Sequence, residues 1–540
     1  MWCQPARITG MNISAPITSQ TITLTQRKVV LAACFGTFLE WYDFLTFASL
    51  ATYFSVLFFP PDNPTAALLA SLATFGVGML VRPLGAAVFG SLGDKYGRRP
   101  IFITTIFLMG VTTFGVGLLP TYANVGMLAP ALLLVLRLLQ GFAVGGEIGG
   151  AAVYLTEHAP NNRRGFYTSV LQLMGPLGII ASTVQVVALQ YWLSDSEFRE
   201  WGWRVPFLLS IVLLLISLKS RMNMIESPVF NQLREHDDLA KTPLRECLKD
   251  KRTLGRMALL FFCISAGGSL LFFSSQVYTN VFLKSVVKFE PQLASTLVLI
   301  STIALFPLTV FCGWLSDRVG RRPVLLAGLL LGAVAILPVF NGLLHFGNPA
   351  LAQFNQSVEV KLSGENCRYN PFVAPRNDCE RNQEWLTKQG VVYKLEEQSG
   401  APTRISVNTE MPVEGFQPNL LKQALQTAGW PDKADVQRAN LPAIIALLIV
   451  LVVALALITG PQTAVLAELF PARTRYTAAA LPHNLSAGWI GGMSPFMVTL
   501  IGTRMGDVSL GIWYPAGLLC LAFVVGLVFL PETRNTPLER

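Results

Sequence analysis

Two acidic side chains stand in a stretch of the sequence that otherwise avoids charge. Glu40 and Asp43 are the only charged residues between Val29 and Phe59, and their three-residue spacing puts both on one face of a helix. A carboxylate in apolar surroundings tends to bind a proton, whereas one beside a guanidinium stays ionised. An acid that is paired with an arginine in one state and unpaired in another can therefore release a proton in the first state and bind one in the second.

A basic partner for these acids is available in another apolar run. At about 1.5 Å per residue, Asp43 lies about 21 Å from the start of its run at residue 29, and Arg137 lies about 14 Å from the start of its own run at residue 128. In an apolar layer about 30 Å thick both are near mid-depth. We therefore expect Asp43 to pair with Arg137 and to release it on protonation. The pair could instead only hold two helices together, and Glu40 is the second candidate for the proton.

Further side chains could hold a polar ligand at the same depth. Arg82 stands just before Pro83, and its planar fork of donors suits a carboxylate, either in a binding site or in an inner gate. The second half of the chain keeps almost no such charge and offers neutral polar groups. The residues predicted to bind a ligand are Arg82, Arg137, Tyr42, Gln172, Gln276, Tyr278 and Asn484, and those predicted to couple it to protons are Asp43, Glu40 and Arg137.

The elements that must position these residues are long apolar runs. Of the 540 residues 52% are hydrophobic and 14% are charged, with a mean hydropathy of +0.49. Twelve runs are long enough to cross a bilayer as helices, and continuous runs are not the alternating pattern of a β-barrel. The sequence predicts an all-α polytopic membrane protein. The predicted spans are 29–56, 66–90, 101–119, 128–155, 168–192, 205–218, 257–283, 293–315, 324–344, 441–466, 477–501 and 511–530.

Basic residues gather in every second connection between these runs, which predicts that both termini are cytoplasmic. This distribution also explains the net charge of +9 without nucleic acid. No cleavable signal peptide is expected in the polar first 25 residues, and Met11 is an alternative start to Met1. The predicted domains are a cytoplasmic tail (1–28), a six-helix bundle (29–218), a cytoplasmic linker (219–256), a second six-helix bundle (257–530) interrupted by an extracytoplasmic insertion (345–440), and a cytoplasmic tail (531–540).

An internal repeat supports the division into two bundles. "GSLGDKYGRRP" (90–100) returns as "GWLSDRVGRRP" (313–323), and "EHAPNNRR" (157–164) returns as "ELFPARTR" (468–475). The second pair of copies is separated by more chain than the first, which indicates an insertion between them. The polar block 345–440 fits that insertion, and it is either a small structured subdomain or disordered. Its two cysteines, Cys367 and Cys379, favour structure and could form a disulfide outside the cell.

The duplicated Gly-x-x-x-Asp-x-x-Gly-Arg-Arg sequence resembles the signature of the major facilitator superfamily. "RLLQGFAVGGE" (137–147) resembles its fourth-helix motif, and "PETRN" (531–535) resembles the ending after helix twelve that is common in its sugar and metabolite transporters. Three further stretches together resemble its metabolite:proton symporter subfamily: "EWYDF" (40–44), "RPLG" (82–85) and "GGEIGGAAVYLTEHAPNNRRGFYTS" (145–169). That subfamily carries α-ketoglutarate, citrate, shikimate, and proline or betaine. The resemblance implies the major facilitator fold and a cytoplasmic gate, to whose basic residues we expect Glu147 to pair. The implied gate residues are Asp94, Arg98, Arg99, Glu147, Asp317, Arg321 and Arg322.

These features predict a secondary active transporter that takes up a small polar metabolite with protons by alternating access. An organic di- or tricarboxylate is the favoured substrate, and a proline- or betaine-type osmolyte is the alternative. A membrane sensor that does not transport and a proton-coupled exporter remain open. No ATP-binding loop, metal-ligand cluster or nucleophile arrangement is evident, so we expect no enzyme activity and no cofactor or metal. The expected partners are the metabolite, protons and the lipid of the plasma (inner) membrane, with a monomer as the working unit.

Overall fold

The computed structural model describes residues 24–60, 64–222, 224–367, 375–398, 402–408 and 412–538. Among them, eleven helices or continuous helical runs are long and apolar enough to cross a membrane. The 35-residue helix α1 (Leu24–Phe58) packs beside them, against α2 and α7. Eleven of the twelve predicted spanning helices are therefore found among the described residues, and α1 covers the first predicted span, 29–56. Of the predicted first tail, residues 1–23 lie outside the described residues, as do both candidate start methionines.

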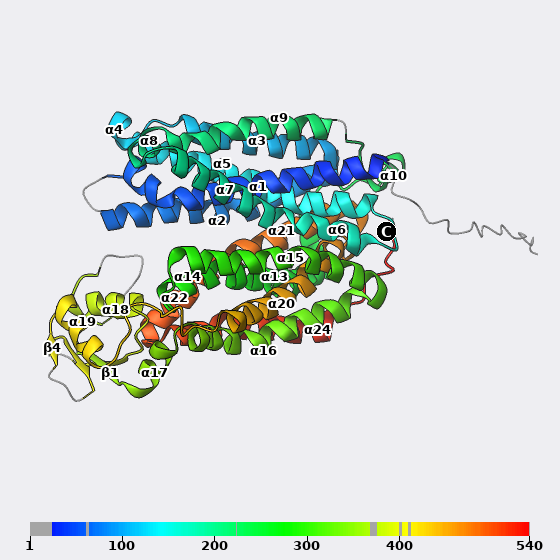
Figure 1. The fold of residues 1–540 in the computed structure, drawn as a ribbon. Coiled ribbons are helices and arrows are strands. Elements are labelled where there is room, and N and C mark those ends of the chain that lie inside the picture. The colour runs from blue at the N-terminus through cyan, green and yellow to red at the C-terminus, as the bar shows by residue number, and fades with distance from the viewer. Residues whose placement is uncertain are drawn as a thin grey trace, which may run out of the picture.

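The chain forms two six-helix bundles that lie side by side (Figure 1). The N-terminal bundle contains α1, α2 (Pro64–Tyr96), α3 (Arg98–Leu118), α5 (Leu128–His158), α6 (Arg164–Gln172) with α7 (Met174–Trp192), and α9 (Val205–Met222). Its connections include the short helices α4 (Tyr122–Val125), α8 (Asp195–Glu200) and η1 (Gly202–Arg204). Most of these helices are apolar on every side, as buried or lipid-facing helices are.

The C-terminal bundle repeats this plan. Its first helix is a continuous run of α12 (Lys251–Leu259), η2 (Leu260–Ser265), α13 (Ala266–Phe272), η3 (Phe273–Tyr278) and α14 (Thr279–Ser285). The others are α15 (Pro291–Val319), α16 (Arg321–Gly347), α20 (Leu441–Glu468), α21 (Arg475–Leu485) with η5 (Ser486–Gly491) and α22 (Ser494–Met505), and α24 (Trp513–Phe529), with the short η4 (Ala472–Thr474) and α23 (Val508–Gly511) between them. The segments η2, η3 and η5 are π-helical, a rare geometry that often marks functional sites.

Two glycines explain how the repeated motif turns the chain. Gly97 and Gly320 each stand between two spanning helices, with φ of 111° and 116°. Glycine tolerates this conformation because it has no Cβ. The next helix begins at the first arginine of the motif in both copies. The acidic side chains of Glu226 and Glu532 accept the backbone N–H groups of the two arginines that open α3 and α16.

The segment that joins the bundles carries two short helices, α10 (Pro228–Glu235) and α11 (Pro243–Lys249). Proline stands in the first turn of each, where its missing N–H costs nothing. The spanning helices α9 and α12 run into the segment predicted as a linker and leave a shorter connection between them. We call the end of the molecule that bears α10 and α11 the linker end, and the opposite end the insertion end (Figure 1).

The inserted segment folds as a small subdomain with its own core. It contains α17 (Pro349–Ser357), β1 (Val360–Gly364), α18 (Asp378–Lys388), β2 (Lys394–Glu397), β3 (Arg404–Val407), β4 (Val413–Glu414) and α19 (Pro418–Thr427). The strands form one sheet in the order β2-β1-β3-β4, in which β1 and β2 are parallel and the other pairs antiparallel. Its apolar core includes Leu362, Ile405, Leu421 and Trp430. The structured alternative for the insertion is therefore the correct one.

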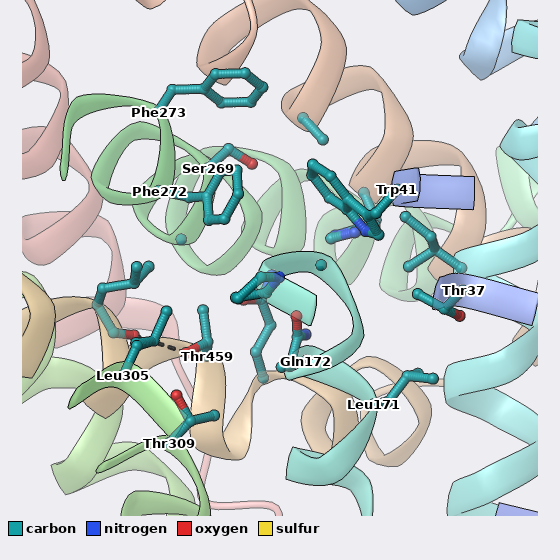
Figure 2. A pocket seen from close by; sticks show the side chains of 18 of the residues that line it. Thr37, Trp41, Leu171, Gln172, Ser269, Phe272, Phe273, Leu305, Thr309 and Thr459 are labelled. Carbon is teal, nitrogen blue, oxygen red and sulfur yellow. Dashed lines mark hydrogen bonds between the residues drawn. The ribbon is translucent and has the colours of Figure 1, made fainter. Parts of the chain in front are cut away.

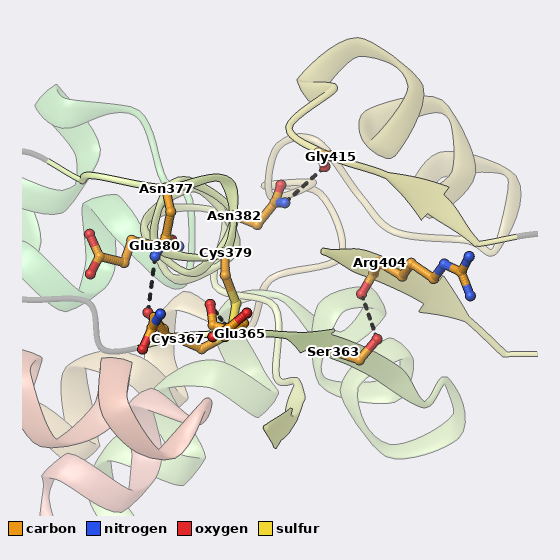
Figure 3. The surroundings of a disulfide bond; sticks show 10 residues. Ser363, Glu365, Cys367, Asn377, Cys379, Glu380, Asn382, Arg404 and Gly415 are labelled. Carbon is orange, nitrogen blue, oxygen red and sulfur yellow. Dashed lines mark hydrogen bonds between the residues drawn. A yellow bond between two sulfur atoms is a disulfide. The ribbon is translucent and has the colours of Figure 1, made fainter. Parts of the chain in front are cut away.

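A disulfide joins Cys367 to Cys379 inside this subdomain, with Cα atoms 5.2 Å apart (Figure 3). It ties the end of the β1 segment to the first turn of α18. The possible pairing proposed from the sequence is present in the structure.

The subdomain rests on the insertion end of the C-terminal bundle. The backbone N–H of Tyr393 donates to the carbonyl of Gly506 (2.8 Å), beyond the end of α22. The amine of Lys288, in the connection before α15, lies 3.9 Å from the centre of the Trp430 ring and donates to Gln389 (2.8 Å). A cation over an aromatic face and a shared backbone bond fix the subdomain to two helix connections of one bundle.

Replacing both disulfide cysteines with serine is expected to loosen the subdomain and leave the helix bundles intact. Closing a loop of this size stabilises a fold by about 3 kcal/mol, chiefly by restricting the unfolded chain. Hydrogen exchange of the whole protein would show faster exchange in β1 and α18 and unchanged exchange in α5 and α20. The control is Cys520→Ser, which removes an exposed free cysteine outside the subdomain. Equal protection of β1 in both variants would contradict the prediction.

Candidate functional site

A cavity lies between the two bundles, and both of them supply its walls (Figure 2). The space between the lining side chains is about 870 Å³, with the open solvent at its mouth included. The lining residues are Thr37, Trp41, Met79, Arg82, Ile148, Leu171, Gln172, Gly175, Pro176, Gly268, Ser269, Phe272, Phe273, Leu305, Thr309, Leu455, Thr459, Gln462, His483 and Ala487.

The charge of this cavity is carried by one residue. Among the described residues that line it, Arg82 is the only arginine or lysine, and none is acidic. The remaining polar groups are hydroxyls, amides and the ring of His483, whose Nδ1 lies 3.0 Å from the hydroxyl of Ser265. The rings of Trp41 and Phe272, one from each bundle, lie 5.2 Å apart. The cavity can hold a molecule with one anionic group, other polar groups and an apolar face.

Arg82 itself is held by an acid behind the cavity wall. Its Nη2 lies 3.4 Å from Oε1 of Glu40, and both side chains are buried. The guanidinium also stands over the ring of Phe44, 5.3 Å from its centre. Neither carboxylate oxygen of Glu40 accepts a hydrogen bond within the part of the chain that the structure describes. The arginine is thus the main partner of this acid.

The second acid of the opening motif forms the predicted pair. Oδ2 of Asp43 lies 3.6 Å from Nη1 of Arg137 and accepts a hydrogen bond from Gln140 (2.9 Å). The guanidinium lies 3.5 Å from the centre of the Phe47 ring. Asp43 and Arg137 both lie inside the N-terminal bundle and do not line the cavity. The structure brings the two together as expected, but away from the space where a ligand would bind.

Glu147 has a different partner from the expected one. Its carboxylate pairs with both terminal nitrogens of Arg221, near the end of α9, and accepts from the hydroxyl of Thr105 (3.2 Å). The expected pairing with the basic gate residues is wrong, because the carboxylate is already bound by Arg221 of α9 and by Thr105 of α3. This buried pair ties α5 to α9.

Of the residues predicted to bind a ligand, Arg82 and Gln172 line the cavity. The hydroxyl of Tyr42 instead donates to Gln185 and lies 3.0 Å from the carbonyl oxygen of Pro206 inside the N-terminal bundle. Asn484 donates to the carbonyl of Gly145 (3.0 Å) and so joins α21 to α5. Both side chains are used in packing in this structure.

The two predicted residues on the first helix of the C-terminal bundle also point elsewhere. Gln276 accepts a hydrogen bond from Thr302 of α15 (2.5 Å). The Tyr278 ring packs 5.5 Å from the ring of Phe340. Both lie in η3, where the π-helical winding rotates the side chains away from the positions that α-helical spacing would give.

The aspartates of the repeated motif join the bundles at the linker end. Asp94, at the end of α2, accepts from the backbone N–H groups of the second and third residues of α21 (3.1 and 2.8 Å). Asp317, at the end of α15, accepts from those of the second and third residues of α6 (both 2.8 Å). The free N–H groups of a helix start favour an anion. Each bundle thus caps a helix of the other.

A second layer of charges crosses the same boundary. Glu157, at the end of α5, accepts from Arg475 of the C-terminal bundle (2.8 Å). In the matching place, Glu468 at the end of α20 lies 3.7 Å from Arg164 of the N-terminal bundle. These four residues are the first and last positions that the second sequence repeat has in common, and all four are buried. The repeat therefore encodes a symmetric pair of ion pairs.

The two arginines of each motif act differently. Arg98 and Arg321 are buried and lie 3.5 and 2.7 Å from the aspartate of their own motif. Arg99 and Arg322 point outward and donate to carbonyls of α9 and α24 in their own bundles (2.6 and 2.8 Å). Only the first arginine of each motif thus belongs to the buried network between the bundles.

Comparison with known proteins identifies the family to which a chain with this architecture belongs. The family model described as "Sugar (and other) transporter" matches residues 29–253 and 425–540, which is more than half of the chain. The chain belongs to this family. It is therefore an integral membrane transporter with the major facilitator fold, and not an enzyme.

Several curated proteins are similar to this chain in sequence. The inner membrane metabolite transport protein YhjE of Escherichia coli (strain K12) is 37% identical over 61% of this chain and 75% of its own length. The shikimate transporter of the same strain is 36% identical over 60% of this chain and 74% of its own. A proline/betaine transporter from that strain is 34% identical over 60% and 67%. The resemblance to metabolite symporters inferred from the motifs agrees with these relatives.

Solved structures show the same fold at lower identity. The proton:xylose symporter XylE bound to 6-bromo-6-deoxy-D-glucose superposes with a TM-score of 0.63 at 16% identity, over 96% of this chain and 98% of that one. The fold of this transporter family therefore extends over both bundles described above.

Sequence reasoning missed several residues of the cavity wall. Trp41 lies within the quoted acidic motif, but its apolar ring gave no reason to expect a binding role. Ser269 and Phe272 lie between the two π-helical segments. Gln462 stands next to Pro461 in α20, and a polar residue in so apolar a helix was a signal that could have been used.

Proposed function

We propose that this transporter carries a small organic carboxylate into the cell together with protons. The observation that carries the proposal is the cavity between the bundles, where Arg82 is the only lysine or arginine and no acid competes with it. A guanidinium with a planar fork of donors recognises a carboxylate more strongly than neutral groups do. The single cation favours one carboxylate at this point over the two or three of a di- or tricarboxylate, which narrows the expectation from the sequence.

The hydroxyls and amides around the cavity support a hydroxylated or amide-bearing body for the substrate. The name of the shikimate transporter, one of the relatives, fits this chemistry, since shikimate is a hydroxylated ring with one carboxylate. The rings of Trp41 and Phe272 offer an apolar face to such a ring. This match of groups is the reason for testing ring carboxylates first.

A proline- or betaine-type zwitterion is the second candidate. Its carboxylate would bind Arg82, and its ammonium would stand against the aromatic pair of Trp41 and Phe272, which attracts cations through the ring faces. The proline/betaine transporter among the relatives bears a name consistent with this choice. The two candidates are separated by which labelled compound accumulates in the uptake experiment.

We further propose that the structure corresponds to the state that is closed to the cytoplasm. The Asp94 and Asp317 caps and the buried ion pairs would break when the linker end opens, and they would form again when the empty carrier resets. The linker end would face the cytoplasm, as the positive-inside rule requires, and the disulfide-bearing subdomain would face an oxidising outer compartment. The working unit would be a monomer in the inner membrane.

The test is uptake by the purified protein in liposomes. Labelled shikimate, succinate, citrate, proline and betaine are offered at an outer pH one unit below the inner pH. We expect a carboxylate to accumulate above its outer concentration, and only to equilibrate once a protonophore collapses the gradient. Failure of every compound to enter would favour a sensor, and outward movement of amphiphilic compounds would favour an exporter.

A further inference from the structure

We propose that Arg82 is shared between Glu40 and the substrate, so that an arriving carboxylate displaces Glu40 and the displaced acid takes up one proton. This inference rests on the proposed function. It attributes the coupling between substrate and proton to a single exchange of partners at Arg82. It also assigns the transported proton to Glu40, and not to Asp43, which was the first candidate from the sequence and lies on the same helix face.

The position of Arg82 makes the exchange possible. Its side chain lines the cavity, whereas Glu40 does not, so the guanidinium stands between the ligand space and the acid. The Glu40 to Arg82 distance of 3.4 Å is long compared with about 2.7–2.9 Å for a strong charge-assisted hydrogen bond. Neither Glu40 oxygen accepts a described hydrogen bond. A substrate carboxylate that meets the fork directly would bind it better than Glu40 does.

Within the part of the chain that the structure describes, the surroundings of Glu40 offer no other partner that is free. On its own helix it has Asp43, another acid, and the charged groups that face it from α5 and α9 are Glu147 and Arg221. Those two are paired with each other. From the other bundle, His483 of α21 interacts electrostatically with Arg82 and lines the same cavity. A displaced Glu40 carboxylate would therefore be buried without a cation, an unfavourable state that binding a proton relieves.

The exchange keeps charge and atoms in balance. A carboxylate and a proton enter from the same side; the carboxylate takes the place of Glu40 at Arg82, and the proton converts the Glu40 carboxylate to its neutral acid. When the substrate leaves on the other side, Arg82 returns to Glu40 and the proton departs. Each turnover moves one proton with one carboxylate, so the transport of a monoanion carries no net charge and that of a zwitterion carries one positive charge.

Asp43 lacks the features that the exchange needs. Its arginine, Arg137, does not line the cavity, and its carboxylate also accepts a hydrogen bond from Gln140. A ligand in the cavity therefore meets neither member of this pair. In the proposal the Asp43 to Arg137 pair holds α1 to α5.

The decisive experiment measures proton uptake on binding in a weakly buffered detergent solution with a pH indicator. The probes are shikimate, succinate, citrate, proline and betaine, each first tested for binding by calorimetry. Wild-type protein is expected to take up about one proton per carboxylate bound, with an affinity that falls by up to tenfold per pH unit as pH rises. Glu40→Gln is expected to bind the same compound without proton uptake and with an affinity independent of pH.

Each remaining outcome has a distinct meaning. Binding to wild type without proton uptake, or uptake that persists in Glu40→Gln but is lost in Asp43→Asn, overturns the exchange and leaves the proposed function standing. Absence of binding for all five probes overturns the proposed function and this inference with it. If Glu40→Gln fails to fold, Glu40→Asp keeps the acid on a shorter arm and is expected to retain the uptake with a shifted pH dependence; an unshifted dependence would also overturn the exchange.

Discussion

Replacing Arg82 with glutamine is expected to abolish accumulation of the carboxylate substrate. The variant loses the single cation of the cavity wall, and truncating one partner of a buried charge pair typically costs about 2–5 kcal/mol. That range corresponds to a loss of at least about 30-fold in affinity. Arg82→Lys keeps the charge without the planar fork, so an intermediate loss is expected. The measurement is the initial rate of uptake in liposomes as a function of substrate concentration.

The control for this variant addresses folding. Removing Arg82 alone leaves Glu40 buried without its cation, which can lower stability on its own. The double variant Glu40→Gln/Arg82→Gln removes both charges, so we expect its thermal stability to recover while uptake stays lost. Recovery of uptake in the double variant, or wild-type affinity in Arg82→Gln, would show that the arginine is structural.

Asp317→Asn is expected to shift the protein toward the state that is open at the linker end. The carboxylate accepts two backbone N–H groups of α6 from the other bundle, and an amide can accept with one oxygen only. A hydrogen bond to a charged group contributes about 1.5–3 kcal/mol, so the population of the open state should rise about tenfold or more. Spin labels at Asn162 and Val319, one in each bundle at the linker end, would report longer distances.

The matched control is Glu226→Gln. Glu226 also accepts two backbone N–H groups at a helix start. That helix, α3, belongs to the N-terminal bundle, and Glu226 stands shortly after α9 of the same bundle, so this contact does not join the two bundles. We expect this variant to lose stability without a change in the distance between the labels. Asp94→Asn, in contrast, removes the other cap between the bundles and should shift the distances in the same direction as Asp317→Asn. Equal effects of all three substitutions would refute the gate role.

The sequence was a good guide wherever a signal repeats or stands out against its surroundings. The two copies of the Gly-Arg-Arg motif pointed to Asp94 and Asp317 as gate residues, and both side chains do join the bundles, although the helices that they cap belong to the other bundle and not to their own motif. Cys367 and Cys379 were the only cysteines in a long polar segment, and they pair. Asp43 and Arg137 were predicted to meet because two buried charges at equal depth stabilise each other.

Other partners could not be predicted, for a physical reason. Apolar helices such as α1 and α2 show little contrast between their faces, so the sequence does not say which side chains point into the cavity. The Glu40 to Arg82 pair and the partner of Glu147 depend on that rotation. The π-helical turns of η3 also changed the directions in which the Gln276 and Tyr278 side chains point. These choices are set by packing between distant segments and not by local pattern.

The docking of the inserted subdomain has a mechanical consequence. Its described backbone and cation contacts go to the C-terminal bundle alone, at Lys288 and Gly506. In the proposed transport cycle, in which the two bundles move relative to each other, the subdomain would therefore move with the C-terminal bundle and show a larger displacement than the residues near the substrate. An antibody fragment or a dye fixed to α19 would follow the cycle from outside the bilayer while leaving the pathway itself untouched.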